Sequence, residues 1–182
     1  MKKFRDFIYN QHDVVCNQKY ANVLPYSFHL GSVEAQFNKF ERLLPCDLAI
    51  NNNTNDTFFR AACIAHDAIE DARLTHADIV EAVRKYLGGS FTDCLMVADI
   101  VFCVTDEKGK IRGERKNDKY YAELKKNKYA IFIKLADLAA NTLFSKLTGS
   151  SMYDKYKKEW PDFKEKLYVE EYEEFFNYVE NL

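Results

Sequence analysis

Apolar side chains recur every three or four residues through almost the whole chain, and this spacing limits the fold more than any other feature. Four such runs are Phe4, Phe7 and Ile8; Val33, Phe37 and Phe40; Ile79, Val83 and Leu87; and Leu95, Ala98 and Phe102. This spacing places side chains on one face of an α-helix, whereas strands need strict alternation, which is nearly absent. The sequence therefore predicts an all-α protein.

Breaks in the apolar pattern divide the chain into eight or nine predicted helices. LTHADIVEAVRKYLGG has the start and stop signals of a helix, with Thr75 as N-cap, Asp78 three residues later and two glycines at the end. Residues 129–144, YAIFIKLADLAANTLF, contain a strand-like run, but their length and alanines favour a buried helix. Residues 153–182 predict two amphipathic helices, with a helix start at Pro161.

Length and charge limit the class of protein. A chain of 182 residues, 47% of them hydrophobic, is expected to form a single domain, residues 1–182. The net charge of −2 gives no protein-wide positive field, which argues against nucleic-acid binding. No signal peptide or membrane span is expected, because Arg5 and Asp6 interrupt the apolar start and the run CLMVADIVFCV is too short. Five scattered cysteines fit a reducing compartment, so we expect a cytoplasmic protein.

One core-like stretch, AACIAHDAIEDARLTHADI, sets His66, Asp67, Glu70 and Asp71 among small apolar residues. His66 and Glu70 are four residues apart, as are Asp67 and Asp71, so a helix would place all four on one side. Burial of unpaired carboxylates is costly, and a divalent cation would remove that cost. Imidazole and carboxylate together suit Mn, Fe or Zn, and an ion with an open position can activate water.

The remaining ligands of such a site must come from elsewhere in the chain. His29 in PYSFHLGSV and Asp137 in IKLADLAAN are the best candidates, because each lies in apolar sequence. An isolated His-Asp pair is more often a surface pair or an ordinary hydrogen bond, but the whole set is more specific. His12 and His76 lie in polar settings and are expected to be surface or helix-start residues.

Four motifs resemble the HD-domain metal-dependent phosphohydrolases, in particular the hydrolase domains of RelA/SpoT type and their small stand-alone relatives. AHDAIEDARLTHADI is similar to their LHD.VEDT..T..EI and PYSFHLGSV to their PY..HP..VA. VTDEKGKIRGERK is similar to VTK…(E/F)RK, and IFIKLADLAANT to..IKLAD.L.N. The motifs follow the family order between about residue 4 and residue 145. The resemblance implies a helical HD-domain bundle, with additional helices at about 153–182.

Members of this family hydrolyse the 3′-pyrophosphate of ppGpp and pppGpp, usually with Mn²⁺, and release pyrophosphate with GDP or GTP. Residue by residue, the resemblance implies a divalent ion bound by His29, His66, Asp67 and Asp137. Glu70 and Asp71 match the pair that orients or deprotonates the attacking water. The expected partner is a nucleotide such as ppGpp, with no nucleic acid and no membrane, and self-association is left open.

Substrate contacts are implied at four positions. Asn141 matches the family asparagine beside the nucleotide, although a solvated amide is the alternative. Lys19 lies near a basic pair of the relatives, but Tyr20 and Ala21 stand where basic or small residues are expected.

Arg115 and Lys116 match the family RK and lie in the basic loop KGKIRGERKNDK, residues 108–119. Such cations suit a polyphosphate, and a solvated loop is the alternative for any one of them.

The same residues leave two further functions open: an HD phosphohydrolase acting on another nucleotide or phosphorylated cofactor, and a non-catalytic nucleotide-binding module. Leu30 follows His29 where relatives have Pro, and the segment around residues 45–57 is longer and richer in Asn. These departures leave the substrate more open than the metal. Every metal and catalytic position is filled, which argues against the non-catalytic module.

Overall fold

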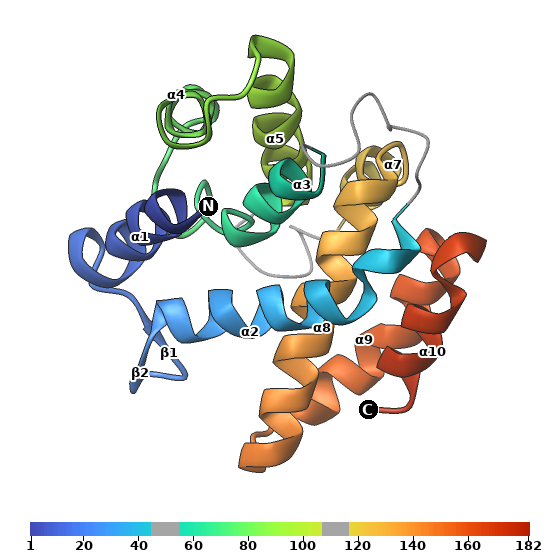
Figure 1. The fold of residues 1–182 in the computed structure, drawn as a ribbon. Coiled ribbons are helices and arrows are strands. Elements are labelled where there is room, and N and C mark those ends of the chain that lie inside the picture. Colours follow the sequence, from blue (N-terminus) through green and yellow to red (C-terminus); the bar gives the residue numbers. More distant parts are fainter. Residues whose placement is uncertain (45–54, 107–116) are drawn as a thin grey trace.

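The structure is a computed structural model that describes residues 1–44, 55–106 and 117–182. These residues are helical apart from turns and one pair of two-residue strands, so the all-α prediction is confirmed (Figure 1). The N-terminal half contains α1 (Lys2–Asn10), the π-helical turn η1 (Gln11–Val15), β1 (Lys19–Tyr20), β2 (Leu24–Pro25), α2 (Tyr26–Phe40) and η2 (Glu41–Leu43). Then follow α3 (Asn55–Ile64), α4 (His76–Leu87), α5 (Phe91–Val104), α7 (Asp118–Leu124), α8 (Lys128–Thr148), α9 (Met152–Leu167), η4 (Glu170–Tyr172) and α10 (Glu173–Glu180).

Helices α2 and α8 cross near the middle of the molecule and contact each other closely (Figure 1). Helices α1, α3, α4 and α5 lie on one side of this crossing, and α9 and α10 lie on the other. One cluster of buried apolar side chains extends from Phe4 in α1 to Leu182. Among the helices of the described ranges, none combines the length and apolar character needed to cross a membrane.

The boundaries of α4 follow from the cap residues that the sequence predicts. The Thr75 hydroxyl accepts from the Asp78 backbone N–H, and the Asp78 carboxylate accepts from the Thr75 N–H. Gly88 ends the helix at φ +70°, a left-handed conformation that favours glycine. A second capping box, Ser90 with Asp93, begins α5.

Helix α8 includes the strand-like run that made its sequence ambiguous. Ile131, Phe132 and Ile133 are all buried, because α8 runs through the centre of the molecule and contacts α2, α5, α9 and α10. The buried residues of α8 lie on several of its faces, so periodicity alone could not assign it. The prediction of a buried helix is confirmed.

The prediction that a helix starts at Pro161 is wrong, because Pro161 lies inside α9. Pro161 is exposed, whereas Trp160 and Phe163 are buried beside Phe176, with ring centroids 5.8 and 6.5 Å from its ring. Proline removes one backbone hydrogen bond from a helix interior. The packing of these rings offsets that loss, so the helix continues. The C-terminal segment does contain two α-helices, as predicted, but α9 ends at Leu167 and α10 begins at Glu173.

Candidate metal centre

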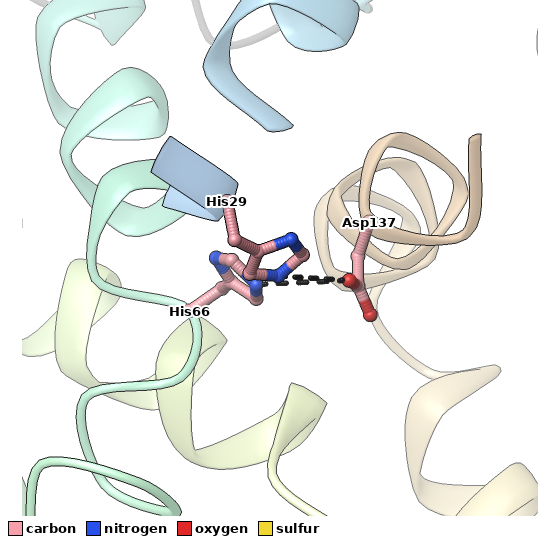
Figure 2. A group of neighbouring side chains, drawn as sticks. All are labelled: His29, His66 and Asp137. Carbon is pink, nitrogen blue, oxygen red and sulfur yellow. Dashed lines mark ion pairs between the residues drawn. The ribbon is translucent and has the colours of Figure 1, made fainter. Parts of the chain in front are cut away.

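Three side chains from three separate elements meet at one point (Figure 2). His29 comes from the first turns of α2, His66 from the segment after α3, and Asp137 from the middle of α8. One ligand atom from each lies within 4.8 Å of the others. His29 Nε2 is 3.4 Å and His66 Nε2 is 3.8 Å from the same oxygen, Asp137 Oδ1.

Asp67 completes the predicted set of four ligands. Its Oδ2 is 3.0 Å from His66 Nε2 and 3.4 Å from His29 Nε2. The structure therefore brings together two imidazoles and two carboxylates from residues 29 to 137, a donor set that suits a first-row divalent ion.

The segment that carries His66 and Asp67 is not the helix that the sequence predicts. Helix α3 ends at Ile64, and residues 65–72 form successive turns. Their backbone hydrogen bonds do not keep the regular four-residue spacing of an α-helix. Ala68 N–H donates to the Ala65 carbonyl, three residues back, and Asp71 N–H donates to the Asp67 carbonyl, four residues back, each at 2.8 Å. The four ionisable groups still converge, but through turns of almost fully buried alanines, which let the chain fold tightly.

The imidazole of His66 is oriented by the end of α3. Its Nδ1 is 2.9 Å from the Cys63 carbonyl oxygen, so Nδ1 carries the proton and the lone pair of Nε2 faces the cluster. Asp67 Oδ2 is 3.0 Å away but can only accept, so within the described residues the buried His66 Nε2 has no hydrogen-bond donor. A buried lone pair without a donor is costly, and a metal ion would satisfy it. The residues present therefore fit a divalent cation.

The charges of the cluster are matched to one another. Burial would lower the pKa of His29, but hydrogen bonds to Asp137 and Asp67 raise it to about 9. Burial would raise the pKa of Asp67, but His66 and His29 hold it well below its usual value. Lys134, whose Nζ is 3.2 Å from Asp137 Oδ2, likewise helps to lower the pKa of Asp137 against the effect of burial. Without a metal, His29 and Lys134 are the cations that balance these carboxylates.

A cavity of about 220 Å³ opens beside the cluster. Six of the predicted site residues line it: His29, Asp67, Glu70, Asp71, Asp137 and Asn141. Burial and the neighbouring Asp106 carboxylate raise the pKa of Glu70 to about 8. A carboxyl group with a pKa in this range is matched to proton transfer near neutral pH.

Asn141 is held at the cavity wall by two hydrogen bonds. Its Nδ2 donates to Asp137 Oδ1 at 2.6 Å, and the Tyr20 hydroxyl donates to its Oδ1 at 2.8 Å. Lys19 is exposed and does not line the cavity, whereas its neighbour Tyr20 does. Arg115 and Lys116 lie outside the described residues, as does most of the 45–57 segment.

Several cavity residues were not identified from the sequence: Tyr20, Tyr26, Asp106, Lys134, Tyr156 and Phe163. Lys134 and Tyr26 could have been identified from the sequence, because they lie in the IKLAD and PYSFH motifs. Tyr156 and Phe163 had no such signal, since they come from α9, outside every motif.

The prediction for His12 is wrong, and the prediction for His76 is confirmed. His12 is fully buried at 0% exposure, because the turn η1 brings it beneath the start of α2. The side chain of His76 is 36% exposed and pairs with Asp99 at 2.8 Å, away from the cavity.

No family model matches this sequence, and comparisons with curated proteins and with solved structures find no similar protein. The candidate site therefore rests on its own residues and geometry.

Proposed function

We propose that this chain is an HD-domain phosphohydrolase that removes the 3′-pyrophosphate of ppGpp and pppGpp, with Mn²⁺ as the expected ion. The observation that carries the proposal is the convergence of His29, His66, Asp67 and Asp137 beside a cavity that Glu70 also lines. The order of the four motifs in the sequence adds the substrate class. Hydrolysis would add one water and release pyrophosphate with GDP or GTP.

Each of these residues has a role that its position supports. A bound divalent ion would polarise a phosphoryl oxygen and lower the pKa of a water molecule. Glu70, in its carboxylate form, would accept the proton of the attacking water. Lys134 would place a buried positive charge beside the phosphates, where the low dielectric strengthens its effect.

Other residues that line the cavity have the chemistry of a nucleoside site. Tyr20, Tyr156 and Phe163 provide aromatic surface, and Asn141 provides a polar group held in a fixed orientation. Aromatic rings can stack on a base, and an amide can hydrogen-bond a base or a ribose.

A second candidate is hydrolysis of another phosphorylated nucleotide by the same metal centre. Tyr20 favours it, because an aromatic residue lines the cavity beside the place where relatives have a basic pair. A neutral ring at this point changes which phosphate or base is accepted.

The test is pyrophosphate release from ppGpp with added Mn²⁺, using wild type, Asp67→Ala, Glu70→Gln and the exposed control Glu81→Gln. We expect release by wild type and the control, and losses of at least about 100-fold in the two site variants. Bound Mn²⁺ should disappear in Asp67→Ala and remain in Glu70→Gln.

A wild-type protein that binds Mn²⁺ but leaves ppGpp intact, beside an active alarmone hydrolase, would refute the proposed substrate. Release of phosphate or pyrophosphate from another nucleotide in a parallel panel would then support the second candidate. Retention of full activity in Glu70→Gln would refute the role of Glu70.

A further inference from the structure

His12 is a buried, polar side chain that the proposed chemistry does not use. It lies in η1, a π-helical turn, and such turns occur often at functional sites. Its ring is fully buried and stacks on the ring of Tyr26, with centroids 4.8 Å apart and planes at 5°. His12 does not line the cavity. Any influence on the site must therefore pass through its neighbours.

The first neighbour is Gln18. His12 Nδ1 is 2.7 Å from Gln18 Oε1, and because this oxygen only accepts, Nδ1 is the donor. The amide nitrogen of Gln18 is then turned away from His12. Burial and Asp67 raise the pKa of Asp71, while hydrogen bonds from Tyr26 and Gln18 oppose that rise. Gln18 thus fixes the orientation of the His12 ring, and its side chain also acts on Asp71.

The second neighbour is Tyr26. Its hydroxyl oxygen is 2.7 Å from Asp67 Oδ2 and 2.6 Å from Asp71 Oδ2, so one hydroxyl group joins a predicted metal ligand to the second acidic residue. The position of the Tyr26 ring therefore determines how these two carboxylates are spaced. His12 covers one face of this ring. His29 makes an edge-type contact with it, with ring centroids 5.4 Å apart.

The second ring nitrogen of His12 makes an imidazole energetically unfavourable at this position. Nε2 is buried and has no hydrogen-bond partner among residues that the structure describes. Burial lowers the pKa of His12, which keeps the ring neutral. A phenylalanine would fill the same space without this unsatisfied atom, so packing alone does not account for a histidine here.

We propose that His12 is a positioning residue of the metal centre, which is held by Gln18 and fixes Asp67 and Asp71 through the ring of Tyr26. This inference rests on the proposed function only in assuming that the centre binds a divalent ion. Groups of this kind, which orient a ligand without touching the ion, commonly change metal affinity by 10- to 100-fold.

The test is a double-mutant cycle read by Mn²⁺ affinity in calorimetry. His12→Phe keeps a ring on Tyr26 but loses the donor to Gln18, and Gln18→Ala removes the other end of the same bond. We expect each single variant to weaken Mn²⁺ binding about tenfold. The double variant should bind no more weakly than about either single one, because both changes break the same connection.

Ile8→Val is the matched control, since Ile8 is buried in the adjacent helix α1 and does not line the cavity. It should lower the melting temperature without changing the affinity for Mn²⁺. If His12→Phe fails to fold, Gln18→Ala decides alone, because Gln18 is only partly buried. Affinities within twofold of wild type in the folded variants, or fully additive losses, would overturn the proposal.

Pyrophosphate release is measured on the same proteins as a separate readout. Wild type that binds Mn²⁺ without hydrolysing ppGpp would refute the proposed substrate but leave the role of His12 intact. Wild type that does not bind Mn²⁺ would overturn both.

Discussion

Two ionisable side chains of the cavity have pKa values well above their usual ones. His29 is raised to about 9, because Asp137 and Asp67 outweigh the opposing effect of burial. Glu70 is raised to about 8 by burial and by Asp106. The two shifts have the same direction but opposite meaning, because the first favours a charge and the second disfavours one. Each leads to a pH dependence that can be measured.

Metal binding is expected to strengthen as the pH rises toward 9. A histidine must be neutral to bind a metal ion. In the metal-free protein the pKa of His29 is about 9, so its imidazole is protonated below that pH. Mn²⁺ affinity should therefore rise up to about tenfold per pH unit between about pH 6.5 and 9, with one proton released. Calorimetry in buffers of different ionisation enthalpy measures both quantities. His76→Gln should leave the slope unchanged, and a pH-independent affinity would contradict the prediction.

Glu70→Gln is expected to stabilise the metal-free protein at alkaline pH. The same substitution is expected to abolish hydrolysis by the metal-loaded protein. The native state keeps a proton on Glu70 up to about pH 8, whereas the unfolded chain loses it near its usual pKa of 4.5. Stability conferred by the wild-type residue therefore falls as the pH rises from 4.5 through 8, and glutamine avoids this loss.

At pH 8.5 in EDTA we expect the melting temperature of Glu70→Gln to be higher by about 2–4 °C, which corresponds to about 1 kcal/mol. At pH 4 the two proteins should melt within about 1 °C of each other, since both side chains are then neutral. An equal difference at both pH values would show that packing, not charge, separates them.

At the level of elements, the site depends on helix ends and turns more than on helix faces. Tyr26 and His29 lie in the first turns of α2, and the backbone N–H of Ser27 donates to Asp13 Oδ1 at 3.0 Å. His66 and Asp67 follow the last turn of α3. Helix ends leave backbone groups free for such bonds, so polar side chains there can be oriented without disrupting a helix. Helices α4 and α5 have caps of their own and contribute no residue to the cavity.

Thr75→Ala is expected to destabilise the fold without affecting the metal centre. The change removes the N-cap of α4 and should lower the free energy of unfolding by about 1 kcal/mol. Urea unfolding measures the loss, and Thr75→Ser, which keeps the hydroxyl, should restore most of it. A tenfold change in Mn²⁺ affinity in Thr75→Ala would contradict the separation between this cap and the site.

At the level of the whole molecule, the metal centre joins segments that are distant in the chain. His29, Asp67 and Asp137 lie in α2, in the turns after α3 and in α8, and α9 completes the cavity with Tyr156 and Phe163. The crossing of α2 and α8 brings the first and last of these ligands together (Figure 1). A ligand that binds only this arrangement stabilises the entire fold by mass action.

Mn²⁺ is therefore expected to raise the melting temperature of the whole protein. At a concentration of about 100 times Kd the gain is about 2.7 kcal/mol, or about 5–11 °C for a chain of this size. Asp137→Asn should lose most of this shift, while Glu81→Gln should retain it, as followed by scanning calorimetry. A shift of equal size in Asp137→Asn would place the ion elsewhere.

Local interactions made part of this protein predictable from sequence. The caps of α4 depend on residues three or four positions apart, and the buried character of α8 shows in its apolar run. The four candidate ligands could also be identified, because each is a polar residue in apolar sequence, and such residues need a partner.

The sequence by itself determined the helical class, the helix caps and the residues able to bind a metal, because these depend on periodicity and on side-chain chemistry along short stretches. Only the tertiary structure decided that residues 65–72 turn instead of continuing α3, that His12 is buried beneath Tyr26, and that α9 continues through Pro161 to line the cavity. Each of these outcomes is set by contacts between segments far apart in the chain. The free energy of such contacts exceeds local preferences, which reach about 1 kcal/mol for most residues and about 3 kcal/mol for a proline within a helix.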